Sequence, residues 1–429
     1  MISNWLSAAL ARRNIHYGWA MVAVTFLAAL ISAGTVGAPG VFIVPLQKEF
    51  GWSAAEISSA LSIRLILFGL MAPFAAALLN RYGLRNVTLV AQLIVASGLL
   101  ASLFMTQVWQ LVLLWGVVVG IGTGMTALVL GATIATRWFV ARRGLVVGIL
   151  TASVATGQLL FLPLLAAITE RLGWRIALAL VCMMLGVAAF AVLMVMRDRP
   201  SDVGLRPFGD EGTEPLPAPP PNTAPIMAAA LGTLRDSSKS TVFWVLFATF
   251  FICGASTNGL IQVHLIPMCL DFGIPQVQAA SLLAAMGVFD FVGTIISGWL
   301  SDRYDNRWLL FWYYGLRGLS LLFLPYSDFT FYGLSLFAVF YGLDWIATVP
   351  PTVRLTAQRF GPERANLVFG WIFAGHQLGA GVAAFGAGLT RTVYATYLPA
   401  FFVAGALCIV AALIVLTISR PAKVAAATV

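Results

Sequence analysis

The chain has 429 residues, of which 60% are hydrophobic and only 10% are charged. A soluble domain carries about a quarter charged residues, and no globular core could bury this much apolar surface, so the composition excludes a water-soluble protein. The formal net charge of +9 does not indicate a nucleic-acid-binding protein, because the basic residues stand in short clusters between long apolar runs, as in the loops of membrane proteins.

Twelve apolar stretches are each long enough to span a bilayer, which takes about 20 residues. They lie near residues 19–46, 55–79, 87–106, 110–136, 144–168 and 174–196, and again near 241–268, 277–300, 308–326, 329–354, 364–389 and 396–418. Arg12 and Arg13 precede the first stretch without a small-residue cleavage signature, so we expect an uncleaved first helix. The sequence predicts an all-α membrane protein.

Basic residues gather in the connections on one side of these stretches. That side holds Arg81, Arg85, Arg137, Arg142, Arg143, Arg197, Arg199, Arg206, Arg235, Lys239, Arg303, Arg307, Arg359, Arg364, Arg420 and Lys423. The connections on the other side hold Lys48, Arg171, Arg175 and Arg391. Because cytoplasmic loops carry the excess of Lys and Arg, we expect a multi-pass protein of the cell membrane with both termini and the long middle connection in the cytoplasm.

The middle connection contains the run GTEPLPAPPPNTAP. This polar, Pro-rich composition cannot build a core, so the segment is predicted to be a mostly disordered tether. We therefore expect an N-terminal six-helix lobe over 1–197, a cytoplasmic linker over 198–238 and a C-terminal six-helix lobe over 239–429.

The two halves of the chain repeat one another at an offset of 222 residues without a gap. The coincidences pair Pro45 with Pro267, Phe50 with Phe272, Arg81 with Arg303, Arg85 with Arg307, Gly120 with Gly342, Arg137 with Arg359, Arg142 with Arg364, Gly148 with Gly370 and Gly157 with Gly379. They fall at loop corners and packing glycines, where backbone geometry selects the residue. Six spans per unit give both copies one orientation, as in two-lobed transporters, whose solute site lies between the lobes.

Four charged side chains stand inside apolar stretches: Arg64, Asp290, Arg317 and Asp344, with the titratable His376 nearby. A charge in the bilayer core costs several kcal/mol in order of magnitude unless it is paired or faces water, so these residues point to function. Subtracting 222 from 290 gives Phe68, one helical turn from Arg64, so Arg64 and Asp290 project from nearly equivalent faces. A fixed cation and a proton-accepting carboxylate suit a carboxylate solute carried with a proton.

The run GWLSDRYDNR at 298–307 resembles the loop signature of the major facilitator superfamily. Its counterpart AALLNRYGLR at 76–85 is a weaker copy, with Asn80 where the signature has an acid. The run VFIVPLQKEFGWS at 41–53 resembles the end of the first helix in monocarboxylate porters and oxalate/formate antiporters. Trp138-Phe139 and Gly173-Trp174-Arg175 are similar to the same branch.

This resemblance implies twelve transmembrane helices in two pseudo-symmetric six-helix lobes, with the second and eighth helices beside a central cavity. Arg64 and Asp290 would then face that cavity from opposite lobes. In monocarboxylate porters an Arg four residues after the eighth-helix Asp engages the carboxylate; here Asp290 matches the Asp and Thr294 stands at the Arg position. The resemblance also implies a gating loop of Asp302, Arg303, Arg307, Asn80, Arg81 and Arg85.

Further polar residues complete the predicted site. Arg317 is expected to pair structurally with Asp344 or Asp290, and Asp344 serves either that pair or proton coupling. Solute binding is open to Arg64, Asn258, Gln262, Gln158, Gln377 and His376. The uncharged members of that set could instead bond neighbouring helices. Pro350-Pro351 should bend the tenth helix because proline frees backbone carbonyls.

The sequence thus predicts a secondary active transporter of a small organic anion, a monocarboxylate carried with a proton by alternating access. It would act as a monomer without cofactor, metal or nucleic acid. The alternatives are an anion exchanger of the oxalate/formate type, a drug or metabolite efflux antiporter, and a membrane solute sensor. No phosphate-cradling loop and no nucleophile–base pair stand out in the sequence, so we expect neither an ATP-driven pump nor an enzyme.

Overall fold

The computed structural model describes residues 2–37, 39–210, 226–327 and 329–419. The first half of the chain comprises α1 (Ile2–Ala11), α2 (Tyr17–Gly37), α3 (Pro39–Phe50), α4 (Ala54–Tyr82), α5 (Leu84–Ser102), α6 (Val108–Leu111), η1 (Val112–Val119), α7 (Gly120–Gly124), α8 (Ala127–Trp138), α9 (Arg143–Leu172), α10 (Trp174–Val195) and η2 (Pro200–Val203). The second half comprises α11 (Ile226–Ser237), α12 (Thr241–Gly254), η3 (Ala255–Ile261), α13 (Gln262–Asp271), α14 (Gln276–Arg303), α15 (Asn306–Phe323), η4 (Leu324–Tyr326), α16 (Phe331–Asp344), α17 (Val349–Phe360), α18 (Pro362–Tyr394) and α19 (Leu398–Val415).

Membrane-length helices dominate both halves. Within the described residues, nine helical segments are long and apolar enough to cross a bilayer, and Val108–Gly124 is a shorter apolar segment. The predicted stretches 144–168 and 308–326 coincide with α9 and α15. Each predicted stretch is therefore mainly helical over its described residues, while the number of twelve crossings stays a prediction.

Local sequence explains where the helices begin and end. Ser53 caps α4: its hydroxyl accepts from the Glu56 backbone N–H at 3.2 Å, and the Glu56 carboxylate accepts from the Ser53 backbone N–H at 2.8 Å. This reciprocal pair satisfies two amides that the first turn leaves without partners. At the other end, Gly83 adopts φ 87°, a conformation that only glycine enters without steric cost, and separates α4 from α5.

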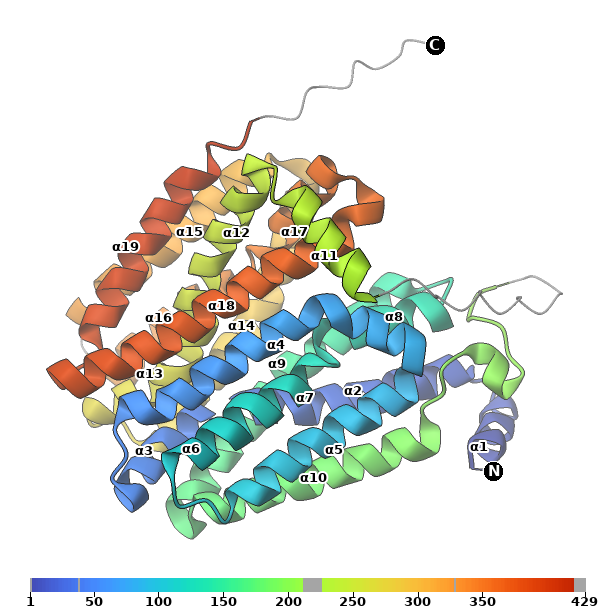
Figure 1. The fold of residues 1–429 in the computed structure, drawn as a ribbon, viewed down its shortest axis with the longest axis horizontal. Helices are drawn as coiled ribbons and strands as arrows, with labels where there is room; N and C mark the ends of the chain where they lie inside the picture. Colours follow the sequence, from blue (N-terminus) through green and yellow to red (C-terminus); the bar gives the residue numbers. More distant parts are fainter. Residues whose placement is uncertain (1, 38, 211–225, 328, 420–429) are drawn as a thin grey trace.

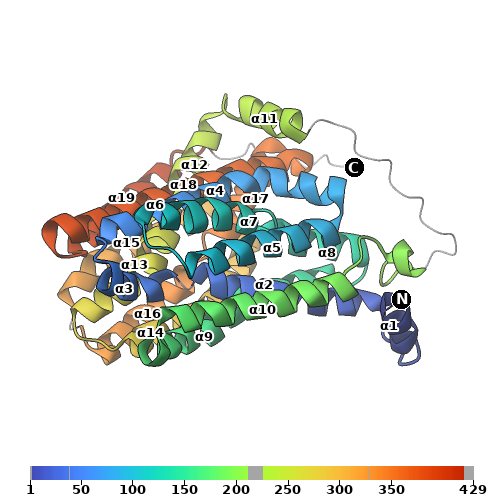
Figure 2. The ribbon, with the colours of Figure 1, turned by 60° about the horizontal axis from the view of Figure 1, so that its bottom comes forward.

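Two long helix pairs join the halves. The helix α4 packs along α18, and α9 packs along α14, so each pair has one member from either half (Figures 1 and 2). Along α18 the contacts run from Thr392, whose hydroxyl accepts from the Ala55 N–H at 3.1 Å, to Phe373, whose ring lies 6.0 Å from that of Phe68. The chain therefore folds into two helical lobes that meet over the length of these helices.

The repeat offset holds in three dimensions. A methyl group built on Gly120 would lie 3.0 Å from the Cα atom of Arg64, so α7 rests on the backbone of α4 there. A methyl group built on Gly342 would lie 3.0 Å from the Cα atom of Met286, on α14. Adding 222 to 64 and 120 gives 286 and 342, so the same helix contact is built twice. The prediction of two pseudo-symmetric lobes is confirmed.

The described flanks of the linker are ordered, which corrects the prediction of a mostly disordered tether. Phe208 donates its backbone N–H to the Trp138 carbonyl at 2.8 Å, and in α11 the Ala230 carbonyl accepts from the Trp371 indole at 2.9 Å. The flanking residues pack against the lobes and form hydrogen bonds with them. The prediction did not anticipate this because it rested on the Pro-rich middle of the linker. The Pro-rich run itself, residues 212–225, lies wholly outside the described part of the chain, so disorder of that run stays a prediction.

The segment from α12 to α13 contacts α18 with an unusual spacing. Gly254 and Gly259 leave room for the carbonyls of His376 and Ala380, and the His264 ring lies 2.8 Å from the Ala384 carbonyl oxygen. The α12–α13 segment thus contacts α18 at every fifth residue (254, 259 and 264), while the contacted carbonyls of α18 come at every fourth residue (376, 380 and 384). The π-helical turns of η3 produce the five-residue step, because their hydrogen bonds join residues five apart.

Candidate functional site: a broken helix inside the C-terminal lobe

The tenth predicted helix is broken in the middle. The helix α16 ends at Asp344, residues 345–348 form a turn, and α17 begins at Val349. Pro350 and Pro351 follow directly; prolines fit the first turn of a helix, where their missing N–H costs nothing, but not a helix interior. The break exposes backbone groups of residues 344–348 that an intact helix would satisfy internally, and these groups must find other partners.

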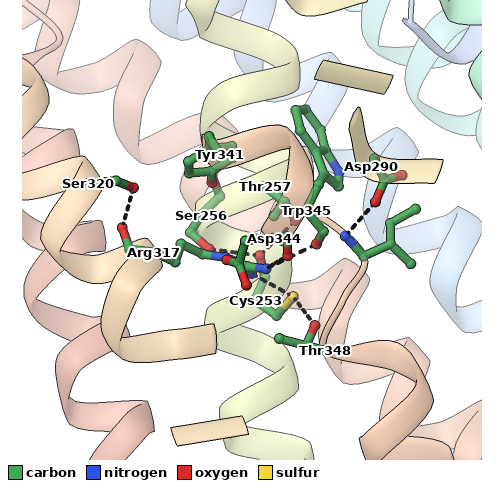
Figure 3. Close-up of polar contacts among 11 residues, drawn as sticks. Cys253, Ser256, Thr257, Asp290, Arg317, Ser320, Tyr341, Asp344, Trp345 and Thr348 are labelled. Carbon is green, nitrogen blue, oxygen red and sulfur yellow. Dashed lines mark hydrogen bonds and ion pairs between the residues drawn. The ribbon is translucent and has the colours of Figure 1, made fainter. Parts of the chain in front are cut away.

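Arg317 from α15 satisfies the carbonyl side of the break (Figure 3). Its guanidinium is fully buried, and Nε donates to Asp344 Oδ2 at 2.6 Å. The Nη2 atom donates to the backbone carbonyls of Asp344 at 2.5 Å and of Trp345 at 3.0 Å, while Nη1 lies 2.9 Å from Cys253 Sγ. A cation at the C-terminal end of a helix complements the helix dipole as well as the carbonyls.

Asp290 from α14 satisfies the amide side of the break. Its Oδ1 atom accepts from the Ile346 backbone N–H at 2.8 Å and from the Thr294 hydroxyl at 3.2 Å. Asp290 is 8% exposed, and the ion pairs of the described residues do not include it. Thr294, which stands where the porter family has an arginine, is therefore a hydrogen-bond donor to the same carboxylate.

Two further side chains hold the turn. Ser297, two turns along α14 from Asp290, donates its hydroxyl to the Ala347 carbonyl at 2.5 Å. Cys253 Sγ lies 3.3 Å from Thr348 Oγ1 (Figure 3). Sequence reasoning missed both residues. The spacing of Ser297 from Asp290 places them on one helix face, which was a usable signal; nothing in the sequence indicated Cys253.

Charge in this cluster does not balance if every group is ionised. Arg317 and Asp344 form a neutral pair, which the sequence predicted as one of two options. Asp290 adds a second buried carboxylate. Within the described residues, the Oδ1 atom of Asp344 has no hydrogen-bond partner. Burying an unpaired charge is costly, so one proton in this cluster would restore neutrality.

Arg64 lies within the other lobe. It is buried, and it borders a narrow cavity whose other lining residues are Pro39, Phe42, Leu99, Trp115, Val119, Leu178 and Val181. All of these belong to the N-terminal lobe, whereas the residues that contact Asp290 belong to the C-terminal lobe. The structure therefore does not bring Arg64 and Asp290 together, and the solute-binding role of Arg64 stays a prediction.

Four of the other five binding candidates lie on two neighbouring segments, η3–α13 and α18, and the fifth, Gln158, belongs to α9. His376 is buried between the rings of Phe250 and Phe373, whose centroids are 4.8 and 5.7 Å away. Gln377 is buried where α18 meets Gly69 of α4, so it stands at the contact between the lobes. Asn258 lies in η3, Gln262 begins α13, and the side chain of Gln158 lies outside the described part. Their roles in binding stay predictions.

The predicted gating residue Asp302 joins two helices. Its carboxylate forms an ion pair with Arg354, so the end of α14 is tied to α17 beyond the break. The side chain of Asn80 lies outside the described part of the chain. The remaining loop residues contact residues of their own lobe. Arg303 lies over the Trp299 ring, and Arg307 pairs with Asp305 and donates to the Ile418 carbonyl at 2.7 Å. Arg81 lies over the Tyr82 ring, and the Arg85 N–H donates to Asp198. A gating role stays a prediction.

Two lobes of membrane-length helices, one of which holds a buried charged cluster, are the architecture of a multi-pass membrane transporter. The family comparison agrees: the model of the Major Facilitator Superfamily matches residues 25–384 and 265–428. The chain belongs to the Major Facilitator Superfamily.

Several relatives cover nearly the whole chain. It is 26% identical over 406 residues to Monocarboxylate transporter 13 of Rattus norvegicus, covering 94% of this chain and 89% of that protein. It is 25% identical over 389 residues to the MFS-type transporter YcxA of Bacillus subtilis (strain 168), covering 88% and 89%. Monocarboxylate transporter 11 of Mus musculus is 30% identical over 292 residues, which cover 67% of this chain and 60% of that protein.

Solved structures share the fold. A D-xylose-proton symporter superposes with a TM-score of 0.70 at 14% identity, covering 95% of this chain and 99% of its own. A mutant of the nucleoside transporter NupG superposes with a TM-score of 0.76 at 11% identity, covering 94% and 100%. At these identities the likeness establishes the fold and does not extend to the solute.

Proposed function

We propose that the protein carries a small monocarboxylate together with a proton across the cell membrane, by alternating movement of its two lobes. The observation that carries this proposal is the charge of the buried cluster. Arg317 neutralises Asp344, and Asp290 lies beside them with a backbone amide and a hydroxyl as its hydrogen-bond partners. A proton on Asp290 makes the cluster neutral, and a cluster that must be neutral in an occluded state suits proton coupling.

The solute class rests on two supports. Relatives that cover most of the chain are named monocarboxylate transporters. Arg64 supplies a buried guanidinium in the N-terminal lobe, and guanidinium groups bind carboxylates through two parallel hydrogen bonds. A carboxylate on Arg64 and a proton on Asp290 would together leave both lobes without excess charge.

Transport in proteoliposomes tests the proposal. With radiolabelled lactate outside, an alkaline interior should drive accumulation, and a protonophore should abolish it. Exchange of lactate without accumulation would instead favour the anion exchanger. If neither lactate nor pyruvate is moved, the monocarboxylate assignment is wrong.

Asp290→Asn identifies the proton carrier. The amide keeps an acceptor for the Ile346 N–H but cannot release a proton, so accumulation should be lost while exchange persists. The matched control is Asp271→Asn, which removes the carboxylate of a partly exposed ion pair with Arg391 in the same lobe and should preserve both modes. Intact accumulation in Asp290→Asn would move the coupling role to Asp344. Loss of both modes would make Asp290 a structural counter-charge.

A further inference from the structure

The break between α16 and α17 keeps two backbone hydrogen bonds, from the Trp345 N–H to the Gly342 carbonyl at 3.1 Å and from the Val349 N–H to the Ile346 carbonyl at 2.8 Å, and side chains bind its other backbone groups. The carbonyls of Asp344 and Trp345 accept from Arg317, and the Ala347 carbonyl accepts from Ser297. The Ile346 N–H donates to Asp290. Four consecutive residues therefore each present a backbone group to a side chain of α14 or α15.

These side chains match the electrostatics of two half-helices. The C-terminal end of α16 carries partial negative charge, and the guanidinium of Arg317 lies against it. The N-terminal end of α17 carries partial positive charge, and the carboxylate of Asp290 binds the amide two residues before Thr348, the residue at the N-cap position of that helix. Discontinuous helices of this kind form the solute and ion sites of many secondary transporters.

Arg317 contributes more to this arrangement than any other side chain shown around the break. It makes three of the hydrogen bonds to residues 344 and 345, one to the side chain and two to carbonyls. Since these carbonyls directly precede Ile346, fixing them fixes where the Ile346 N–H points. The position of the amide that binds Asp290 thus depends on a guanidinium two helices away in the sequence.

We propose that Arg317 is a positioning residue for transport, which holds the broken helix so that the Ile346 N–H stays on the Asp290 carboxylate. It binds no solute in this role. The transport consequences rest on the proposed function, whereas the effect on the break does not, so the two can be tested separately.

Hydrogen–deuterium exchange of the full-length protein in lipid nanodiscs tests the effect on the break. The double variant Arg317→Met/Asp344→Asn removes the guanidinium without leaving a buried charge behind, which protects folding. Exchange at residues 345–348 should rise about tenfold to a hundredfold, because the charge-assisted hydrogen bonds from Arg317 to the carbonyls of this turn no longer oppose its opening. Unchanged exchange would overturn the proposal.

Two controls separate positioning from general loosening. Arg391→Met removes an arginine from the partly exposed pair with Asp271 and should leave exchange at 345–348 unchanged. Ser297→Ala removes a neutral donor to the same turn and should raise exchange there with no change of charge. If the arginine control raises exchange as much as the double variant does, the effect is not specific to Arg317 and the proposal fails.

Transport kinetics provide the second readout. Arg317→Lys keeps the charge but loses the planar fork, so it should keep part of the parent's maximal rate of lactate uptake. The lactate KM should stay within about twofold of the parent in Arg317→Lys, since a residue that touches no solute leaves uniform binding intact. A large rise in KM with a normal maximal rate would make Arg317 a binding residue and overturn the positioning role. Absence of lactate transport in the parent would refute the proposed function, but the hydrogen–deuterium exchange result at residues 345–348 would still test the positioning role.

Discussion

Replacing Gly293 by alanine tests whether the close packing of α14 on α16 keeps the break in place. A methyl group on Gly293 would lie 2.6 Å from the carbonyl carbon of Leu343. Non-bonded carbons meet at about 3.5–4.0 Å, so the two helices must separate by about 1 Å. Asp290 lies one turn earlier on the same helix, and its 2.8 Å bond to the Ile346 N–H would stretch to roughly 3.8 Å, outside hydrogen-bond range.

Two terms contribute to the loss of stability in Gly293→Ala. Overpacking a close contact costs about 1–3 kcal/mol. Losing a hydrogen bond to a carboxylate costs about 1.5–3 kcal/mol more, which gives a total of about 2.5–6 kcal/mol. A domain the size of one lobe melts about 2–4 °C lower per kcal/mol, so the melting temperature should fall by at least about 5 °C.

Intrinsic tryptophan fluorescence of the purified protein in detergent measures this shift. The control is Gly298→Ala on the same helix, where an added methyl group has no neighbour within 4 Å. Alanine favours a helix over glycine by up to about 1 kcal/mol, so the control should melt at or above the parent temperature. If the two alanine variants melt together, the contact at Gly293 does not constrain the helices and the reasoning is refuted.

Three further substitutions test the charged residues. Asp344→Asn should lower the free energy of unfolding by about 3–5 kcal/mol, because it breaks the buried ion pair by removing the carboxylate charge that the Arg317 guanidinium contacts, and a change below about 1 kcal/mol by thermal unfolding would contradict this. Asp302→Asn should cost less than about 1 kcal/mol, since its pair with Arg354 is exposed, and should slow lactate uptake with little change in affinity; lost affinity at normal turnover would count against gating. Arg64→Gln should abolish binding of small carboxylates in a thermal-shift screen while the protein stays monodisperse, and unchanged binding would place the anion site elsewhere.

Much of the fold was predictable because its determinants are local or repeated. Apolar length places the helices, and the offset of 222 residues relates Gly120 to Gly342 before any contact is seen. The π-helical turns in η1 and η3 were not predictable, since neither the apolar run VLLWGVVV nor the small and polar run ASTNGLI is long enough to carry a periodic signal from which a change of pitch could be read. Pro350-Pro351 indicated a bend, but the turn lies upstream, because prolines begin a helix more readily than they interrupt one.

The site was predictable where burial alone dictates the partner. An arginine inside the membrane needs a carboxylate, and the choice of Asp344 over Asp290 depended on which face of α15 meets the break. The expected meeting of Arg64 and Asp290 rested on equivalent positions in the repeat. Equivalent positions in the repeat show which face of its helix a residue occupies, but not which helix packs against that face. In the structure, each of the two residues lies among helices of its own lobe. Asp290 and Arg317 bind backbone groups, and no residue type in the sequence marks a backbone group as a binding partner, so these contacts could not be predicted.

The five-against-four contact between the α12–α13 segment and α18 determines how that segment responds to a change of length. In an ordinary α-helix a step of five residues turns the side chain by about 140°, so Gly254 and Gly259 could not both face α18. A π-helical turn holds about one residue more than an α-helical turn, so a return to α-helical pitch can absorb the deletion of one residue within 255–261. The two ends of the segment then keep nearly the same angle to one another, and Cys253 stays beside Arg317. A single-residue deletion here should therefore be better tolerated than a deletion elsewhere in the same helix, where every later side chain would turn by about 100°.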